Sequence, residues 1–513
     1  MSSAIAGGLP ILAVSAPFLV VAVLMIPAAR SWGLRLMPWA TLPALLVALL
    51  GPDGASQLPG TLLGSTLILG ETTRLALITT ALLWLAASLA TSLATSLALG
   101  RARPSGREQI RMALPGLLAM GGGFGLALAD DGLLWLAAAT LIGYMLYALV
   151  MRDASPAARL AGRRLVVLLV LGDLVLFELL LILAQAADGT SFAALRATLA
   201  TFEDPTLVIV LMILGLGAKA GILGLHAWLL PAFQSTPPAT RIALIAFVLG
   251  AGLLGWTRLL PLGLVDWPGA GMAFGLLALI TAAYALIIGM TSLDQGRLQG
   301  CILMVLTAQW LWALMLALHR PAQGAAIAEL LPVVALLGSL GLAALVLLGE
   351  GDKSALTRQL SSWLAALVVA GSALPLMTPW SGWGEIAMTG LWWPALVLSP
   401  LLGRLLVGAC LGGWSCAMGA GPRSGLARRL DPTGYWTRPH EQARGGYRRL
   451  RRLPLILLPR WRDRLKQRLA AMGAAMMRSK LPRSLENHLL KWEPALLMAA
   501  LIGLMAAWLG YLG

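Results

Sequence analysis

The sequence has few residues of the kinds that build metal sites, disulfide frameworks or soluble surfaces. Its 513 residues include three cysteines and four histidines, and only 12% of the residues are charged. The cysteines, Cys301, Cys410 and Cys416, form no C-x-x-C pair, so neither a zinc site nor a disulfide framework is expected. No nucleotide loop, flavin motif, haem-ligand pair or quinone motif stands out. We therefore expect no metal, no cofactor and no catalytic residues in this chain.

Long apolar runs are what the sequence has instead. Hydrophobic residues make up 59% of the chain, and a run of about 20 such residues crosses the apolar part of a bilayer as an α-helix. The first run ends before the first basic residue, Arg30, so we interpret it as a true span and not as a cleavable signal. The prediction is an all-α polytopic membrane protein of about fourteen spans, near residues 9–28, 37–52, 73–99, 112–129, 132–150, 165–185, 205–223, 240–261, 270–291, 298–318, 325–348, 361–380, 388–411 and 494–512.

The positive charge is concentrated near the C-terminal end. Of the net charge of +16, most comes from residues 423–493, where 18 lysines and arginines stand against five acidic residues. Such a stretch beside a membrane helix is typical of the anionic cytoplasmic face, and we expect no nucleic-acid partner. The spacing of apolar and basic residues in 455–490 predicts an amphipathic helix that either braces neighbouring subunits or anchors to lipid headgroups. The alternative is an irregular basic loop.

Charges in the predicted loops indicate an orientation. Arginine-rich loops, such as 101–111 and 152–164, alternate with loops that carry acids, such as 130–131 and 188–204. The positive-inside rule then predicts that both termini lie outside, in the periplasm, and that the basic 423–493 stretch is cytoplasmic. We expect a multi-pass protein of the bacterial inner membrane.

One lysine interrupts an apolar helix and is the main functional clue. Lys219 lies within the run 205–223, and His226 follows two turns later. A charged amine at bilayer depth costs roughly 2.5 to 3.5 kcal/mol in insertion free energy, so the folded protein must solvate or pair it. Glycines around Lys219, including Gly221 and Gly224, predict a broken helix, which survives at this depth only against protein or a water-filled cavity. We therefore expect a buried, hydrated site.

The motif K-A-G-x-x-x-L-H-x-W-L, residues 219–229, resembles the antiporter-like membrane subunits of respiratory complex I, hydrogenase 4 component B or formate hydrogenlyase, and multisubunit Na⁺/H⁺ antiporters. The resemblance covers about residues 60 to 400. It implies two inverted five-helix repeats, helices 4–8 and 9–13, with helices 7 and 12 broken. The implied division is N-terminal helices in 1–111, repeats in 112–261 and 262–411, a basic interfacial segment in 412–493 and a terminal span in 494–513.

The proton relay that the resemblance implies is degenerate. The helix 5 glutamate that pairs with the lysine in the family is replaced by Thr140, which can position water near the amine but cannot change its charge. Lys219 and His226 remain, and Glu329 is a candidate substitute in helix 11. The other relay positions carry an arginine, Arg297, or side chains with no ionisable group, namely Leu244, Gln299, Val333 and Leu337.

Each candidate has an alternative. Lys219 is either an ion-handling group or a structural cation that caps carbonyls of the broken helix. His226 is either a relay member or a helix-end residue bonded to backbone, and Glu329 either joins the relay or faces interfacial water.

Three functions are consistent with these residues. The first is a subunit of a complex I-like or hydrogenase-like assembly, which takes part in proton or sodium translocation coupled to a partner's redox chemistry and has no active site of its own. The second is the energising subunit of an inorganic-carbon accumulation system with a peripheral zinc protein. The third is a non-conducting scaffold. All three imply other membrane subunits, a peripheral cytoplasmic subunit and the lipid bilayer as partners.

Overall fold

The computed structural model describes residues 3–348 except for 59–64, 98–105, 154, 188, 292–293 and 320. Within them, nine helices are long and apolar enough to cross a membrane, and a bent helix pair supplies a tenth candidate. The chain is thus an all-α polytopic membrane protein, with one small β-ribbon that the sequence analysis did not predict. Predictions for residues beyond 348, namely the broken helix 12, the basic segment and the terminal span, lie outside the described residues.

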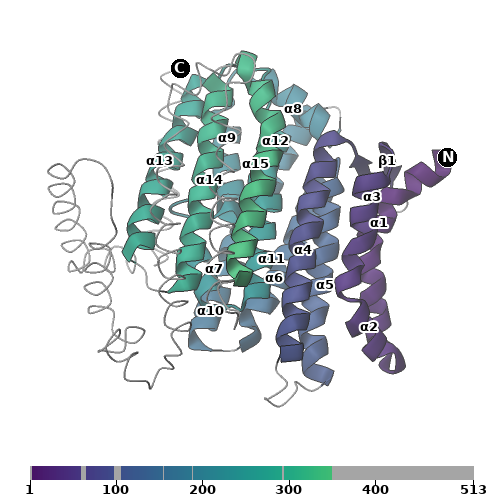
Figure 1. Cartoon of the computed structure of the whole chain (residues 1–513). Coiled ribbons are helices and arrows are strands. Elements are labelled where there is room, and N and C mark those ends of the chain that lie inside the picture. The colour runs from purple at the N-terminus through teal and green to yellow at the C-terminus, as the bar shows by residue number, and fades with distance from the viewer. Residues whose placement is uncertain are drawn as a thin grey trace, which may run out of the picture.

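The N-terminal helices stand at one end of the molecule, drawn in purple (Figure 1). Helix α1 (Ser3–Met25) is followed by a 3-10 turn, η1 (Pro27–Ala29), α2 (Arg30–Leu36), a second 3-10 turn, η2 (Pro38–Thr41), and α3 (Leu42–Leu50). The predicted span 37–52 forms a shorter helix, Pro38–Leu50, which passes as a span only together with Pro27–Leu36, and the two halves meet at an angle of 60°. Pro38 lacks a backbone N–H and disfavours helical backbone in the residue before it, so the bend falls at Met37.

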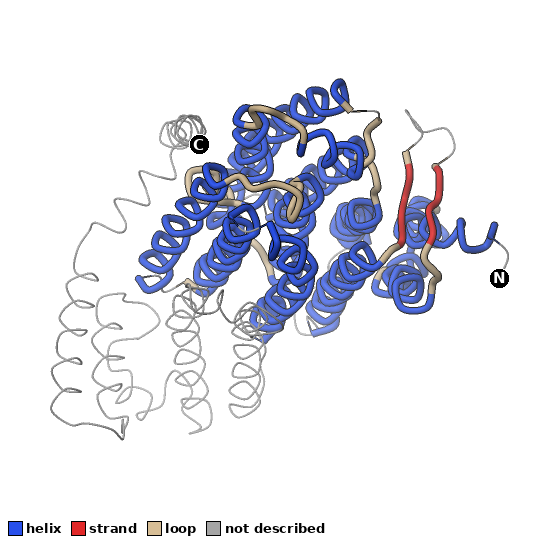
Figure 2. The backbone as a smooth tube through the Cα atoms, turned by 90° about the horizontal axis from the view of Figure 1, so that it is seen from above, coloured by secondary structure: helices blue, strands red, loops and turns tan. Residues whose placement is uncertain are grey.

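A two-stranded antiparallel ribbon follows α3. Strand β1 (Gly54–Gln57) pairs with β2 (Thr66–Leu69), and Gly54 lies opposite Leu69. Seen from above, the ribbon lies at one edge of the bundle (Figure 2). Arg74 ties its base to α3, because its guanidinium donates to the carbonyl of Ala48 at 2.6 Å and pairs with Asp53 at 2.5 Å.

Four long helices come next: α4 (Glu71–Leu97), α5 (Gly106–Leu128), α6 (Gly132–Val150) and α7 (Pro156–Ala186), the last after a 3-10 turn, η5 (Met151–Asp153). Side chains cap their starts where the chain turns. Asp131 accepts a hydrogen bond from the N–H of Leu134 at 2.8 Å, and Ser155 accepts one from that of Ala158 at 3.1 Å. Such caps satisfy N–H groups that have no partner within the helix, which fixes where each span begins.

The acid-bearing turns meet on one face of the bundle. The hydroxyl of Thr66 in β2 donates to Asp130 at 3.3 Å, and the N–H of Phe192 at the start of α8 (Phe192–Ala200) donates to the carbonyl of Asp130 at 2.9 Å. Arg258 joins them, because its guanidinium donates to the carbonyl of Ala129 at 2.7 Å. These contacts hold the ends of α5, α6 and α8 together. In Figure 1, α8 lies near the top and β1 at the upper right.

The predicted break in helix 7 is confirmed. Helix α9 (Thr206–Ala220) is followed by eight non-helical residues, Gly221–Trp228, and α10 (Leu229–Ser235) begins at Leu229. The next span begins as α11 (Pro238–Phe247), continues through a π-helical segment, η6 (Val248–Leu253), and ends as α12 (Leu254–Leu259).

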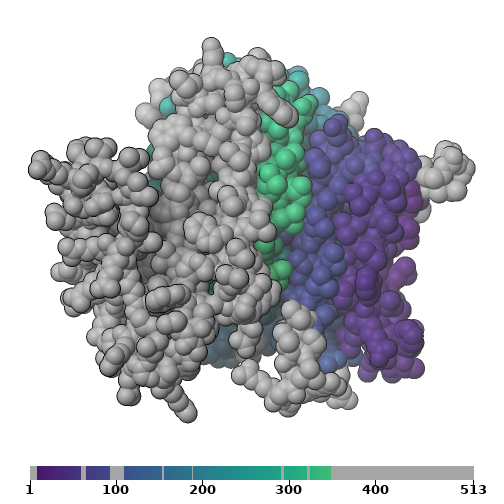
Figure 3. Space-filling model, viewed as in Figure 1, coloured from purple at the N-terminus to yellow at the C-terminus, as the bar shows by residue number. Residues whose placement is uncertain are grey.

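Three further long helices complete the described part: α13 (Pro268–Thr291), α14 (Gln295–His319) and α15 (Pro321–Leu348). Helices α14 and α15 pack against one another, and α15 also packs against α4. The space-filling view shows α15, in green, directly beside the blue surface of α4 (Figure 3). Helices more than 200 positions apart in sequence, α4 and α15, thus both pack against α11, and 89% of the span Pro238–Leu259 that contains α11 is buried.

Candidate functional site

A left-handed glycine ends α9 in the middle of the bundle. Gly221 has φ of 66°, a conformation in which a β-carbon is strained, and its N–H donates to the carbonyl of Gly217. The N–H of Ile222 donates to the same carbonyl at 3.2 Å. This pair of bonds is the usual way for a helix to stop at a glycine, so the K-A-G sequence itself places Lys219 in the last turn.

Neighbouring side chains satisfy the polar backbone groups that the break exposes. The indole N–H of Trp228 donates to the carbonyl of Ala218 at 2.9 Å, and the hydroxyl of Thr307 on α14 donates to that of Ala220 at 3.4 Å. On α13, Thr281 accepts from the N–H of Leu223 at 3.2 Å. An unpaired backbone group costs several kcal/mol in an apolar medium, so these contacts make the break tolerable at bilayer depth.

Lys219 forms an ion pair with Asp173 on α7. The side chain of Lys219 is fully enclosed, with 0% exposure, and its Nζ donates to Oδ1 of Asp173. The hydroxyl of Thr140 on α6 donates to the other carboxylate oxygen, Oδ2, at 3.0 Å. Three helices thus contribute one residue each to a continuous polar chain, from Thr140 through Asp173 to Lys219.

Small residues allow this contact between α7 and α9. A β-carbon at Gly172 would lie 3.1 Å from the β-carbon of Ala218 and 3.2 Å from the carbonyl oxygen of Gly215, so the two backbones touch at this level. Close backbone approach at glycines is a common way to pack membrane helices. Because Asp173 and Lys219 directly follow Gly172 and Ala218, this contact sets the position of the ion pair.

The two members of the pair differ in accessibility. Lys219 lies 5.7 Å from the ring centroid of Phe247 on α11, whereas the side chain of Asp173 is 17% exposed. A small cavity between α6 and α7 reaches Asp173, lined by Thr140, Gly143, Tyr144, Val166, Leu169, Val170 and Asp173 itself. Asp173 therefore has two sides. The open side faces the cavity between α6 and α7, and the closed side faces Lys219 and Phe247.

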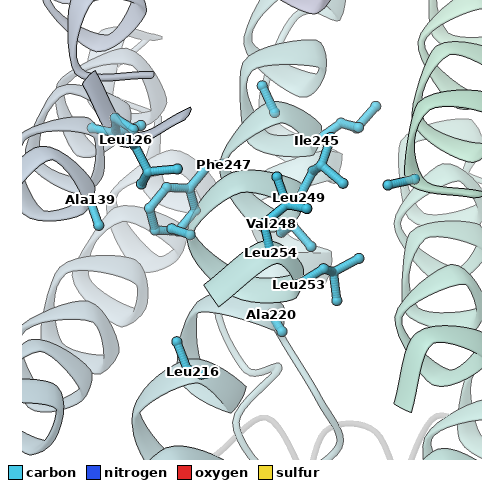
Figure 4. Packing of buried hydrophobic residues seen from close by; sticks show 14 of the residues in the cluster. Leu126, Ala139, Leu216, Ala220, Ile245, Phe247, Val248, Leu249, Leu253 and Leu254 are labelled. Atoms are coloured by element: carbon cyan, nitrogen blue, oxygen red, sulfur yellow. The ribbon is translucent and has the colours of Figure 1, made fainter. Parts of the chain in front are cut away.

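Apolar packing forms the closed side. Leu216 and Ala220 near the end of α9 lie beside the π-helical segment η6, and Phe247 points towards Leu126 and Ala139 (Figure 4). A β-carbon at Gly252 in η6 would lie 2.8 Å from the α-carbon of Ala220, so two irregular backbones meet here without an intervening side chain. π-helical turns occur often at functional sites.

His226 lies in a second polar position within the break. It is fully buried, its Nδ1 accepts from the N–H of Gly224 at 3.3 Å, and its ring meets that of Tyr284 on α13 edge-on at 4.6 Å between centroids. Within the described residues, neither its Nε2 nor the hydroxyl of Tyr284 has a hydrogen-bond partner. No hydrogen bond or ion pair in the described part connects His226 to Lys219.

The structure does not bring Glu329 to the ion pair. It lies on α15 with an exposed side chain, and no hydrogen bond or ion pair joins it to Lys219, Asp173 or His226. Thr140, in contrast, does belong to the site. The sequence analysis expected it to position water near the amine, whereas its hydroxyl donates to Asp173. The described residues include no group of three or more histidines, cysteines, aspartates or glutamates that could hold a metal ion.

The other relay positions also lack a titratable link to the ion pair. Leu244 is buried and apolar in α11. Gln299 on α14 is buried and accepts from Arg241 at 3.3 Å, while the Arg241 Nε donates to the carbonyl of Phe233 at 2.8 Å. These groups stabilise the junction of α10, α11 and α14 and cannot accept or release a proton as a lysine or histidine does.

Known proteins resemble the segment that carries this site. A model of the transmembrane NADH:quinone oxidoreductase/Mrp antiporter family matches residues 130–300, which include Thr140, Asp173, Lys219 and His226. This segment, a third of the chain, is similar to that family. The chain is accordingly a multi-pass membrane protein of the antiporter-like kind. A search of curated proteins finds no match to the chain.

Solved structures extend the likeness of fold beyond the family segment. A subunit of the membrane-bound sulfane sulfur reductase, an archaeal respiratory membrane complex, is 18% identical with a TM-score of 0.60, over 86% of this chain and 97% of that one. A subunit of the Mrp complex from Dietzia sp. DQ12-45-1b is 16% identical with a TM-score of 0.56, over 80% of each chain. Both are parts of multisubunit membrane complexes, and at these identities the likeness is one of fold.

Asp173 is the site residue that the sequence analysis missed. The family pattern places its carboxylate at the position of Thr140, on a different helix. A signal was nevertheless present, because Asp173 is an acid inside the apolar run 165–185, as Lys219 is a base inside 205–223. The same rule that intramembrane charges need partners would have paired them.

Proposed function

We propose that this chain is an antiporter-like subunit of a multisubunit, complex I-like or hydrogenase-like membrane assembly, and that it takes part in translocating protons or sodium ions through the Lys219–Asp173 pair. A partner supplies the driving redox chemistry, and the chain has no active site of its own. The observation that carries the proposal is the enclosed ion pair at the break of α9. The family match and the fold of the respiratory-complex subunit support it.

The pair is suited to coupling because its charges depend on one another. Burying an ammonium ion is costly unless an opposite charge compensates for its desolvation. Removing one partner of a buried pair lowers the stability of the folded protein by about 3–5 kcal/mol. The C-terminal end of α9 adds a favourable field for a cation, because helix dipoles are negative at that end. Lys219 is thus held by Asp173 and by the backbone together.

Proton arrival at Asp173 would change this balance. The carboxylate is the more exposed member and lines the small cavity between α6 and α7, so a proton that arrives there meets Asp173 first. Protonation removes the negative charge that holds Lys219, and the protonated amine is then free to move away from Asp173. Thr140 keeps one carboxylate oxygen hydrogen-bonded and leaves the other for the amine. In this proposal the carboxylate moves from helix 5 to helix 6 of the family fold, and the pairing is retained.

The contacts between turns support the alternation of loops on which the inferred orientation depends. The acid-bearing turns at Asp130 and Phe192 meet on one face, as alternate loops of a spanning bundle should. By the positive-inside rule we assign this face to the outside, and we propose a bacterial inner membrane with a peripheral partner on the opposite, cytoplasmic face.

The test compares neutralising variants in the assembled complex. We expect Lys219→Met and Asp173→Asn each to lower ion-coupled activity at least tenfold in reconstituted vesicles, with subunit composition unchanged. Asp204→Asn, in an exposed loop before α9, is the matched control and should behave as the wild type. Normal assembly with unchanged coupling in both site variants would favour the scaffold hypothesis instead.

Copurification identifies the driving partner. Iron–sulfur or hydrogenase-like subunits in the purified complex would agree with the redox proposal. A zinc protein without redox centres would contradict it in favour of the inorganic-carbon hypothesis.

A further inference from the structure

A second acidic residue of α7, Glu178, lies on the outside of the bundle at bilayer depth. Its side chain is exposed, and it makes no hydrogen bond or ion pair within the described part of the chain. Eight residues separate it from the end of α7 at Ala186, which is about 12 Å along the helix axis. Helix α7 is about 46 Å long and exceeds the roughly 30 Å apolar layer, so a centred helix places Glu178 about 10 Å from the bilayer midplane, inside that layer.

Glu178 belongs to a straight line of exposed residues on α7. Going along the helix in steps of three and four, the exposed side chains are Val167, Leu171, Leu174, Glu178 and Leu181, and the apolar ones are 38% to 61% exposed. A line with this spacing is the surface along which two helices pack at a small crossing angle. We call these five residues the α7 seam.

Lipid alone is a poor cover for this line. Acyl chains match leucine and valine, but they offer no donor to a carboxylate, and ionisable groups in membrane spans normally face a protein interior, a polar partner or a water-filled cavity. Asp173 follows this rule through Thr140 and Lys219. It is also five residues from Glu178, about 140° around the helix, so its partners do not serve Glu178.

We propose that the α7 seam binds a transmembrane helix of another subunit, and that this helix carries a lysine, arginine or histidine at the depth of Glu178. Charge complementarity selects this occupant, because a cation at that depth needs a partner as much as the carboxylate does. Small or branched apolar residues on either side of the cation would pack between the leucines of the seam. The inference rests on the proposed membership of a multisubunit complex, and it adds the surface of contact and the chemistry of the partner.

Site-directed photo-crosslinking in the assembled complex tests the seam. A photoreactive amino acid replaces Leu174 or Leu181 in the full chain, and Leu46 on α3, which is 55% exposed at another part of the bundle, serves as the control. We expect the two seam positions to crosslink to one other membrane polypeptide, in a peptide with a basic residue within one turn of the attachment point. The control should not give that product.

Variants of Glu178 test the charge. We expect Glu178→Leu and Glu178→Lys to reduce the amount of that polypeptide that copurifies by roughly tenfold or more, because each leaves the partner's cation unpaired. An acidic residue introduced at the partner's basic position should restore copurification with Glu178→Lys.

Three results would overturn the inference: crosslinks to lipid only, crosslinks within the same chain, or copurification unchanged by both Glu178 variants. Crosslinking requires assembly but no ion movement. The crosslinking result can therefore be interpreted even if the Lys219 and Asp173 variants leave transport unchanged. Likewise, the absence of a crosslink does not affect the transport test.

Discussion

Gly172 on α7 lies so close to Gly215 on α9 that a β-carbon at Gly172 would stand 3.2 Å from the carbonyl oxygen of Gly215. Asp173 is the next residue on one helix, and Lys219 lies one turn further on the other. The distance between the ion-pair partners is therefore set by the contact of two backbones, and the flexible lysine side chain has only a short gap to cross.

Widening this contact should separate the pair. We expect Gly172→Val to destabilise the protein by about 1–3 kcal/mol through overpacking against Ala218 and to lower ion-coupled activity. The measurements are the thermal unfolding midpoint in detergent and coupled transport in vesicles. Gly125→Ala on α5 is the control, because its β-carbon would meet neighbours at 3.8 Å, an ordinary contact distance. An unchanged midpoint in Gly172→Val would contradict the role of the backbone contact.

The hydroxyl of Thr140 should matter more than its shape. Thr140→Val keeps the volume but removes the donor to Oδ2 of Asp173, and a bond to a charged group contributes about 1.5–3 kcal/mol. We expect a fall of roughly tenfold in coupled activity, measured as initial transport rate, with assembly retained. Thr140→Ser keeps the donor and should recover most of the rate. Equal rates for the valine and serine variants would show that the hydrogen bond has no part in coupling.

The carboxylate should be transferable between α6 and α7. Asp173→Asn removes the charge that pairs with Lys219, and adding Thr140→Glu restores one acid on the adjacent helix. Because Oγ1 of Thr140 lies 3.0 Å from Oδ2 of Asp173, a carboxylate at position 140 would stand close to the lost one. We expect the double variant to recover at least part of the activity that the single variant loses. Coupled transport of wild type, both single variants and the double variant gives the interaction energy between the positions. An additive result, with no recovery, would mean that Asp173 acts through its own position and not through its charge.

Trp228 should act as a structural cap of α9. Trp228→Phe removes the indole N–H that donates to the carbonyl of Ala218 at 2.9 Å but keeps an aromatic ring near Phe247. Leaving that buried carbonyl unpaired should cost about 1–3 kcal/mol of stability. We expect a lower unfolding midpoint with coupled transport reduced much less than in the Asp173 variant. A transport defect as large as that of Asp173→Asn, at normal stability, would instead place the indole in the ion path.

The sequence alone predicted the elements whose cause is local. Gly221 marked the break in helix 7, because a helix that stops at a left-handed glycine needs only the residues around it. The apolar runs before residue 348 all form helices, since spanning length is a property of each run. Pro38, by comparison, stands at the start of the run 37–52, and the 60° bend before it was missed although proline disfavours helical backbone in the preceding residue.

The site was predicted only in part, because ion pairing depends on which helices are neighbours. Lys219, His226 and Thr140 were found by motif position, whereas Asp173 stands 46 residues from its partner, on a helix where the family pattern gave no reason to look. The role of His226 stays a prediction, as does that of Glu329, which the structure leaves on the outer side of α15. The edge-on contact of His226 with Tyr284 could not be read from sequence, because Tyr284 had no motif of its own.

The π-helical segment at Val248–Leu253 holds the two ends of its span in a particular rotational phase. A π-turn contains one residue more than an α-turn, so residues after Leu253 face about 100° away from where a continuous α-helix would direct them. Arg258 lies in that rotated part, with its guanidinium on the carbonyls that end α5, while Gly252 lies against the backbone of Ala220. If the π-helical turn shifted to another position along the helix, the contact of Arg258 with the end of α5 and the contact of Gly252 with α9 would change together. One movable irregularity would then link the outer rim of the bundle with its centre.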